Sequence, residues 1–436
     1  MVVSRKHGLV ALGVSAFLVG TCGLAAAALS APGSAQGLRA EARPGLADDD
    51  EDQPWNDGGD RLEQACEAPL KNGLAPATNW HFFTNCLRAV RDNWNRASGA
   101  AVGNAAGDAR ARVIAAMSLD DVGFRDSRRS LRGAQGFAAF FGSDGGRAAP
   151  ADLQVAWLND VGQPYNGMGQ SGLAYFLFQL AASAQAGGYP RAQQDVALYR
   201  GLAAGIMRTV LLDTRAGGLD TEMPCTTLRG RSCSWYHSVS RRDRPARSGL
   251  TLNQDLHVLR DLGMMIDLHR KMGWPVPAGW EDAIGAGLNQ VFQPGSRSRM
   301  GDLPTFQDYL SEPVGRDNVQ WLYYGFNADK PLGSGGYFLN RNGKDCGYQV
   351  HVLDLTAQLM ERAQRTRTWQ PPAGAMTCAS PLAQAYRATR IRMTNPDPAA
   401  WSSPMARRDT MCPAKAQETF AKVRAEFYAS AFDRCG

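Results

Sequence analysis

The residues best suited to chemistry lie at the starts of predicted helices. In the stretch "SGLTLNQDLHVLRDLGMMIDLH", from Ser248 to His269, the first two turns carry Asn253, Asp255 and His257. The apolar positions, spaced three and four residues apart, form one stripe and predict a buried helix face. Asp255 falls on that apolar side, where a carboxylate is costly to bury without a partner. The helix therefore opens with polar groups, one of which points inward.

Two other predicted helices share this layout. "PYNGMGQSGLAYFLFQL" opens with Tyr165, Asn166 and Gln170, and "NGKDCGYQVHVLDLTAQL" opens with Tyr348 and His351. Each follows a loop and becomes apolar after a polar first turn. Because Asn, Asp and Ser favour helix starts as caps, two interpretations stay open. The polar groups are either ordinary caps or the lining of a shared pocket.

Ordinary amphipathic helices alternate with these three. Alternation of buried and half-buried helices predicts an all-α fold, an (α/α) toroid or barrel of helical hairpins with long irregular loops, stabilised by disulfides. The long loops, at 217–247 and 294–345, have room for short strands. The chain has no sustained period-2 alternation and no Rossmann or P-loop glycine pattern.

The N-terminus has the pattern of a targeting segment. Arg5 and Lys6 precede a long apolar run that ends in small residues. This pattern predicts an export signal over residues 1–35, cleaved after Ala35, although a run of this length also suits an uncleaved membrane anchor. An acidic, flexible linker is expected over 36–60 and the toroid domain over 61–436. The protein is therefore expected in the periplasm or the secreted fraction.

The composition of the chain limits the classes of partner that we expect it to bind. The chain has 436 residues, 44% of them hydrophobic and 20% charged, with a formal net charge of +6. It can bury a large core, but nucleic-acid-binding proteins concentrate basic charge more strongly. We therefore expect no nucleic acid, and a membrane contact only if the N-terminal segment is uncleaved. A weakly charged or anionic small molecule or polymer fits better.

Cysteine usage agrees with export. Nine cysteines are present, and eight remain once Cys22 in the signal is set aside. An even number in an exported chain predicts that all eight form disulfides. Sequence neighbours are expected to pair, Cys225 with Cys233 among them, because short loops close most readily. No CxxC or HExxH motif occurs, so neither a metal site nor a cofactor is expected.

The order of segments over 162–363 resembles the C-terminal catalytic domain of D-glucuronyl C5-epimerases, an (α/α) toroid. The resemblance is carried by "NGMGQSGLAYFLFQL", "AGGLDTEM", "LTLNQDLHVLRDLG", "VQWLYYGF" and "GYQVHVLDL". It implies an exported enzyme that acts on a uronic-acid-containing polysaccharide, as an epimerase or as a lyase. It also places a catalytic tyrosine at Tyr348.

Both reactions begin by removing the proton at carbon 5 of the uronate. They need a base, a proton donor and groups that stabilise the charge developing on the carboxylate. The catalytic candidates are Tyr348, His257, His351, Tyr324 and Asp255. The substrate-binding candidates are Tyr165, Asn166, Gln170, Glu222, Trp235, Tyr236, Arg241, Arg242 and Asn253.

The loop "RGRSCSWYHSVSRRDRPARSG" holds six Arg against one Asp. Arginine pairs bidentately with carboxylates, and Trp235 and Tyr236 in this loop have rings that suit stacking on sugars. A plain solvated basic loop is the alternative.

Two other functions remain open. A glycoside hydrolase of the toroid type needs two carboxylates that flank the scissile bond, and Glu222, Asp255, Asp160 and Asp345 are the available members. The other is a non-catalytic exported protein that binds polysaccharide or serves as a scaffold, and it needs no such carboxylate pair.

The arginine-rich loop leads to a binding prediction. We expect the protein to bind a uronic-acid polymer weakly, and to lose that binding as salt screens the attraction over roughly 10 Å at 0.1 M. Titration calorimetry with acidic and neutral glycans at low and high salt measures this. Equal affinity for both glycans at low salt would contradict it.

Overall fold

The computed structural model describes residues 79–116, 136–140, 154–158, 166–237, 250–294, 303–310, 320, 322, 325–326, 337–338, 346–394 and 414–435. The chain divides into two compact units, Met1–Glu51 and Asp52–Gly436, and every described residue belongs to the second. The described part is 71% helical with little sheet, which confirms the mostly helical class. The expected export signal (1–35) and linker (36–60) lie outside it. None of the described helices has the length and apolar character needed to cross a bilayer.

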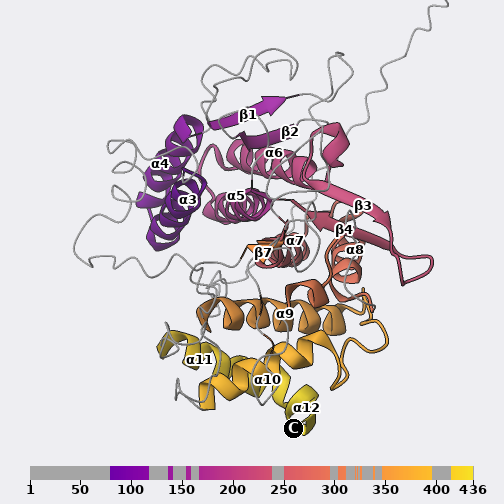
Figure 1. Ribbon diagram of the computed structural model, residues 1–436. Coiled ribbons are helices and arrows are strands. Elements are labelled where there is room, and N and C mark those ends of the chain that lie inside the picture. The colour runs from indigo at the N-terminus through magenta and orange to yellow at the C-terminus, as the bar shows by residue number, and fades with distance from the viewer. Residues whose placement is uncertain are drawn as a thin grey trace, which may run out of the picture. The chain divides into compact units, whose positions relative to one another are not determined.

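The helices follow the predicted windows closely (Figure 1). They are α3 (Asn79–Arg96), α4 (Ala101–Ala116), α5 (Gly167–Gly187), α6 (Ala192–Val210), α7 (Leu252–Met272), α8 (Trp280–Phe292), α9 (Cys346–Thr366), α10 (Pro381–Thr394), α11 (Ala414–Val423) and α12 (Ala429–Phe432). A π-helical turn, Arg424–Tyr428, joins α11 to α12. Helices α5, α7 and α9 fall in the three stretches predicted to be helices with polar first turns.

Short antiparallel strands occupy the loops. β3 (Asp220–Pro224) pairs with β4 (Ser232–Tyr236) inside the first long loop. β5 (Leu250–Thr251) pairs with β6 (Gly325–Phe326), which pairs with β7 (Tyr337–Phe338), so the second long loop also holds strands as expected. A further hairpin, β1 (Gly136–Phe140) with β2 (Gln154–Leu158), was not predicted.

Helices α5 and α7 run in the same direction. Ser171, near the start of α5, donates its hydroxyl to Oδ2 of Asp261, midway along α7, at 2.7 Å. Farther along both helices, the ring of Phe178 meets that of His269 with centroids 4.6 Å apart. The contacting residue numbers increase together along both helices, so the two helices are parallel neighbours.

Helices α7 and α9 are parallel by the same criterion. His257 contacts His351 near the starts, with 2.7 Å between their Nε2 atoms. Nearer the ends, Arg362 pairs with Asp267 at 3.2 Å and lies against Gly263. A Cβ at Gly263 would be only 2.7 Å from the Arg362 side chain, so glycine makes room for this buried arginine.

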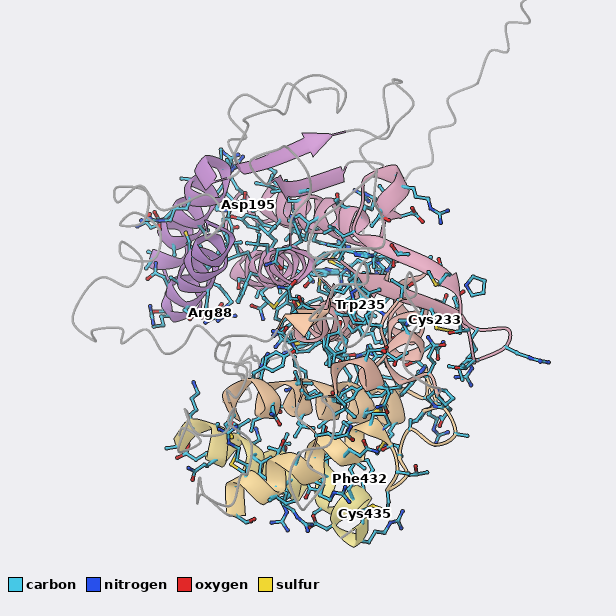
Figure 2. The ribbon with its side chains drawn as sticks, viewed as in Figure 1. Arg88, Asp195, Cys233, Trp235, Phe432 and Cys435 are labelled. Carbon is cyan, nitrogen blue, oxygen red and sulfur yellow. A yellow bond between two sulfur atoms is a disulfide. The ribbon has the colours of Figure 1, made fainter. Side chains whose placement is uncertain are left out.

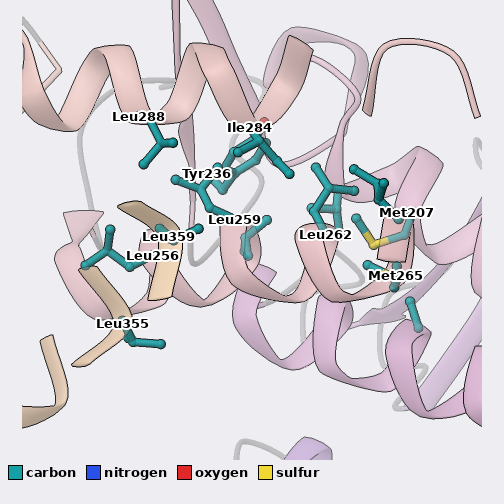
Figure 3. Close-up of a cluster of buried hydrophobic side chains, with 14 of the residues drawn as sticks. Met207, Tyr236, Leu256, Leu259, Leu262, Met265, Ile284, Leu288, Leu355 and Leu359 are labelled. Carbon is teal, nitrogen blue, oxygen red and sulfur yellow. The ribbon is translucent and has the colours of Figure 1, made fainter. Parts of the chain in front are cut away.

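Helix α8 returns along α7, and α10 packs on α9. On α8, Glu281 pairs with Arg270 from the end of α7, while Gly287 packs on Leu259 from its middle. On α10, Thr389 donates to Gln349 Oε1 from the start of α9. Figure 3 shows the apolar interior between α7, α8 and α9, where Leu259 and its neighbours meet. Helices α7 and α8 thus form an antiparallel hairpin, and α5, α7 and α9 run parallel to one another.

The disulfides match the prediction in part. Cys225 is bonded to Cys233, as predicted. Cys86 and Cys346 are also disulfide-bonded, while Cys66 and Cys412 lie outside the described residues. The oxidised cysteines indicate an oxidising compartment.

The expected pairing of sequence neighbours is wrong for Cys378, which bonds Cys435 across 57 residues. The C-terminal helices fold back onto α10, where Tyr386 stacks on Tyr428 with ring centroids 5.0 Å apart. That packing brings the end of the chain to Cys378 and overrides the preference for short loops.

Removal of the two disulfides should cost different amounts of stability. A Cys378→Ala/Cys435→Ala variant should lose about 4 kcal/mol of unfolding free energy, and a Cys225→Ala/Cys233→Ala variant about 2.5 kcal/mol, because the longer loop restricts the unfolded chain more. Urea titration of both variants beside wild type measures the difference. A larger loss for the short-loop pair would contradict the loop-entropy explanation.

Candidate functional site at the helix starts

The start of α5 is fixed to β4 and α7. Asn166 caps the helix in the left-handed region (φ 59°), and its Oδ1 accepts the Gly169 N–H at 3.0 Å. The Gly167 N–H donates to the His237 carbonyl at the end of β4. A Cβ at Gly167 would lie 3.1 Å from that carbonyl and 3.3 Å from the Val258 side chain. The starts of α5 and α7 therefore lie side by side.

A pair of buried histidines joins the starts of α7 and α9. His257 and His351 are 4% and 7% exposed, and their Nε2 atoms are 2.7 Å apart. Burial lowers the pKa of His257 well below its usual value, and Arg260 and His351 lower it further. A neutral pair fits this contact, since one Nε2 must donate and the other accept. His257 Nδ1 has no hydrogen-bond partner among the described residues.

Asp255 points inward, where its carboxyl accepts a hydrogen bond from a backbone N–H of β4. In the β3–β4 register Asp220 faces Tyr236, and the His237 N–H bonds to Leu219. The Tyr236 N–H therefore points away from β3. The fully buried Asp255 accepts it through Oδ1 at 2.9 Å. The carboxyl that the sequence places on the apolar side of the helix thus bonds the edge of β4 that faces away from β3.

Burial favours the protonated form of the Asp255 carboxyl. Burial raises its pKa well above the usual value, and the Tyr236 N–H offsets this only in part. Asp255 Oδ2 has no hydrogen-bond partner in the described part of the chain. The carboxyl therefore keeps one oxygen without a partner in an environment that favours its neutral form.

Asp220 is a second buried carboxyl that the sequence interpretation did not single out. It is 8% exposed and begins β3. Burial raises its pKa first, and Glu222 raises it further, as do Asp255 and Asp213, whereas a hydrogen bond from Ser234 lowers it. The motif "AGGLDTEM" contained it, but only pairing with β4 reveals that its side chain is buried.

Tyr348 lies beside a second tyrosine that was also missed. Tyr348 is 5% exposed at the start of α9. Tyr309 ends the short helix Phe306–Tyr309 and donates its hydroxyl to the Leu250 carbonyl at 3.0 Å. Burial raises the pKa of Tyr309, and Tyr348 and Asp255 raise it further. The three side chains are therefore within electrostatic range of one another.

The remaining described candidates are mostly buried. Trp235, which Figure 2 labels beside Cys233 on β4, stacks on Tyr309 with ring centroids 6.1 Å apart. Tyr236 lies among apolar side chains (Figure 3) and donates its hydroxyl to Ala283. A sugar could stack on either ring only after neighbouring side chains moved.

Three further candidates complete the described set. Gln170 and Asn253 are buried in the first turns of α5 and α7, while Glu222 is exposed on β3. Asn253 Oδ1 has no hydrogen-bond partner within the described ranges. Four candidates, Tyr165, Tyr324, Arg241 and Arg242, lie outside the described residues.

In the part of the chain that the structure describes, no three His, Cys, Asp or Glu side chains are grouped so as to hold a metal ion. Comparison with protein-family models, curated proteins and solved structures finds no match. The site therefore has to be interpreted from its own chemistry.

The raised pKa of Asp255 leads to a stability prediction. The folded state retains a proton that the unfolded chain loses near pH 4, so stability falls as the pH rises above that value, by up to about 1.4 kcal/mol per pH unit. Asp255→Asn keeps an acceptor for the Tyr236 N–H but cannot ionise. We expect this variant to melt above wild type at pH 7–8 and level with it near pH 4.

Scanning calorimetry from pH 4 to pH 8 tests this prediction. Glu418→Gln, a change at an exposed position on α11, is the matched control and should follow wild type throughout. A variant that melts below wild type at pH 8 would show that the Asp255 carboxylate is ionised and stabilising there.

Proposed function

We propose that this protein is an exported carbohydrate-active enzyme that removes the carbon-5 proton of a uronic acid residue in a polysaccharide, as an epimerase or a lyase. The observation that supports it best is the gathering of His257, His351 and Tyr348 at the common starts of α7 and α9. These side-chain types serve as proton acceptors and donors.

The histidine pair suits the role of base. A neutral imidazole accepts a proton; the lowered pKa of His257 keeps it neutral at physiological pH but also makes it a weaker base. Its partner His351 can take up part of the added charge through their shared hydrogen bond.

Tyr348 suits the role of proton donor. A phenol is protonated at neutral pH, as epimerisation requires on the face opposite the base, or elimination near the leaving oxygen. Asp255, with its pKa raised by burial, is a second neutral group able to donate a hydrogen bond near Tyr309 and Tyr348.

We also propose the ring-shaped arrangement of the helices and the export of the protein. Parallel first helices with antiparallel returns are the unit from which an (α/α) toroid is built, and we propose that α5–α10 form part of such a ring. Disulfides agree with export to the periplasm or the medium.

Glycoside hydrolysis is the second candidate because two buried carboxyls lie beside one residue. Asp220 faces Tyr236 across the β3–β4 ladder, and Asp255 accepts the Tyr236 N–H. Hydrolases use such a carboxyl pair, one of them with a raised pKa as the general acid. The assay has to separate the two reactions.

Tyr348→Phe is the sharpest test. Only a hydroxyl leaves an otherwise apolar stripe, so we expect the fold to survive while the rate falls about 10²–10⁴-fold, the usual contribution of a positioned proton donor. The readout is carbon-5 exchange with deuterated water by NMR on a panel of uronans, together with absorbance of unsaturated products and with reducing ends. Exchange alone indicates epimerisation, absorbance indicates elimination, and reducing ends without absorbance indicate hydrolysis.

Tyr199→Phe is the matched control. Tyr199 is fully buried on α6, and its hydroxyl has no hydrogen-bond partner among the described residues, so its loss should leave both melting and rate unchanged. A Tyr348→Phe protein that melts like wild type and stays fully active would make Tyr348 a packing residue. Reducing ends that vanish in Asp220→Asn and Asp255→Asn would then favour the hydrolase.

A further inference from the structure

Four carboxyl groups gather around the start of β3. Asp213 forms a parallel bridge with Asp220, and Glu222 lies two residues along the same strand. Asp255 approaches from α7 through the Tyr236 N–H. Exposure decreases across the group, from the exposed Glu222 through the half-buried Asp213 to the buried Asp220 and Asp255. The group thus extends from an exposed carboxyl to two buried ones.

Acidic residues alone do not define a site, but here two buried oxygens have no partner. Asp220 Oδ1 and Asp255 Oδ2 have no hydrogen bond within the described residues, while the other oxygens of these carboxyls are held by Ser234 and by the Tyr236 N–H. Buried polar atoms in proteins are nearly always hydrogen-bonded. An uncommitted oxygen inside an acidic group leaves room for a donor once the carboxyl ionises.

The charges that act on Asp220 are of one sign. In the described part of the chain they come from Glu222, Asp255 and Asp213, each of which raises its pKa. A group that both donates hydrogen bonds and carries positive charge would satisfy the oxygens and relieve this repulsion.

We propose that Asp213, Asp220 and Glu222 form a subsite for an organic ammonium group, carried by a free-amine hexosamine residue. This rests on the proposed function only in taking the ligand to be a sugar. A polymer that presents both uronate and free amine would then place its carboxylate near the helix starts and its amine at the start of β3.

Binding of the amine should release a proton. Burial and its acidic neighbours raise the pKa of Asp220, which favours the protonated carboxyl when the subsite is empty. A bound ammonium lowers that pKa, so the carboxyl ionises and its proton passes to the buffer. Affinity should therefore rise with pH until the sugar amine itself loses its proton.

Titration calorimetry with a glucosamine tetramer and its fully N-acetylated counterpart tests the subsite, because N-acetylation replaces each charged ammonium group by a neutral amide. Wild type should bind the amine form at least about 10-fold more tightly, the contribution of one charge-assisted hydrogen bond. Its binding heat should depend on the ionisation enthalpy of the buffer. Glu222→Gln should lose about 2–5-fold in affinity for the amine, as an exposed charge would.

Asp220→Asn should abolish the preference for the amine and the proton release together, with a melting temperature at or above that of wild type. Glu418→Gln is the distant control and should bind as wild type does. Equal affinity for the two tetramers, or tighter binding of Ca²⁺ than of the amine at these residues, would overturn the proposal. Because binding is measured without turnover, an amine preference without carbon-5 exchange would refute the proposed function alone, and exchange without the preference would refute this subsite alone.

Discussion

The hydrogen bond from the Tyr236 N–H to the buried Asp255 carboxyl is the contact on which the rest of the site depends. It joins the β3–β4 hairpin to the first turn of α7. The hairpin in turn holds the start of α5 through the His237 carbonyl, and α7 holds the start of α9 through the histidine pair. A fully buried carboxyl is costly, so its position at this junction fixes one geometry where an apolar residue would permit several. The fully buried Tyr309, whose hydroxyl bonds Leu250 just before α7, reinforces the same junction.

Much of the helical framework could be predicted from the sequence because it depends on local periodicity. The stripe of Leu252, Leu256 and Leu259 is buried as expected, and so is the nearly continuous apolar surface of α5. The polar first turn shared by three helices indicated a common site more clearly than the polar residues at the start of any one helix. Side-chain contacts along α5, α7 and α9 show that these turns lie at one end of parallel helices.

What could not be predicted depends on contacts between distant segments. Asp220 becomes a buried acid only when β4 covers it, and Tyr309 lies in a short helical turn that has no periodic pattern. The Cys378–Cys435 bond follows from the return of the C-terminal helices onto α10. Trp235 and Tyr236 are aromatic residues that suit sugar binding in sequence, yet both contribute to the core. Composition and spacing do not distinguish an aromatic residue that binds a ligand from one that packs in the core of its own chain.

The parallel direction of α5, α7 and α9 has an electrical consequence. Peptide dipoles add along a helix and leave roughly half a positive charge at its N-terminus and half a negative charge at its C-terminus. Three parallel helices therefore present three partial positive charges where α5, α7 and α9 begin, while α8, which runs back along α7, brings its negative end toward the start of α7. The backbone alone thus favours an anion at the starts of the three parallel helices and a cation at the end of α8.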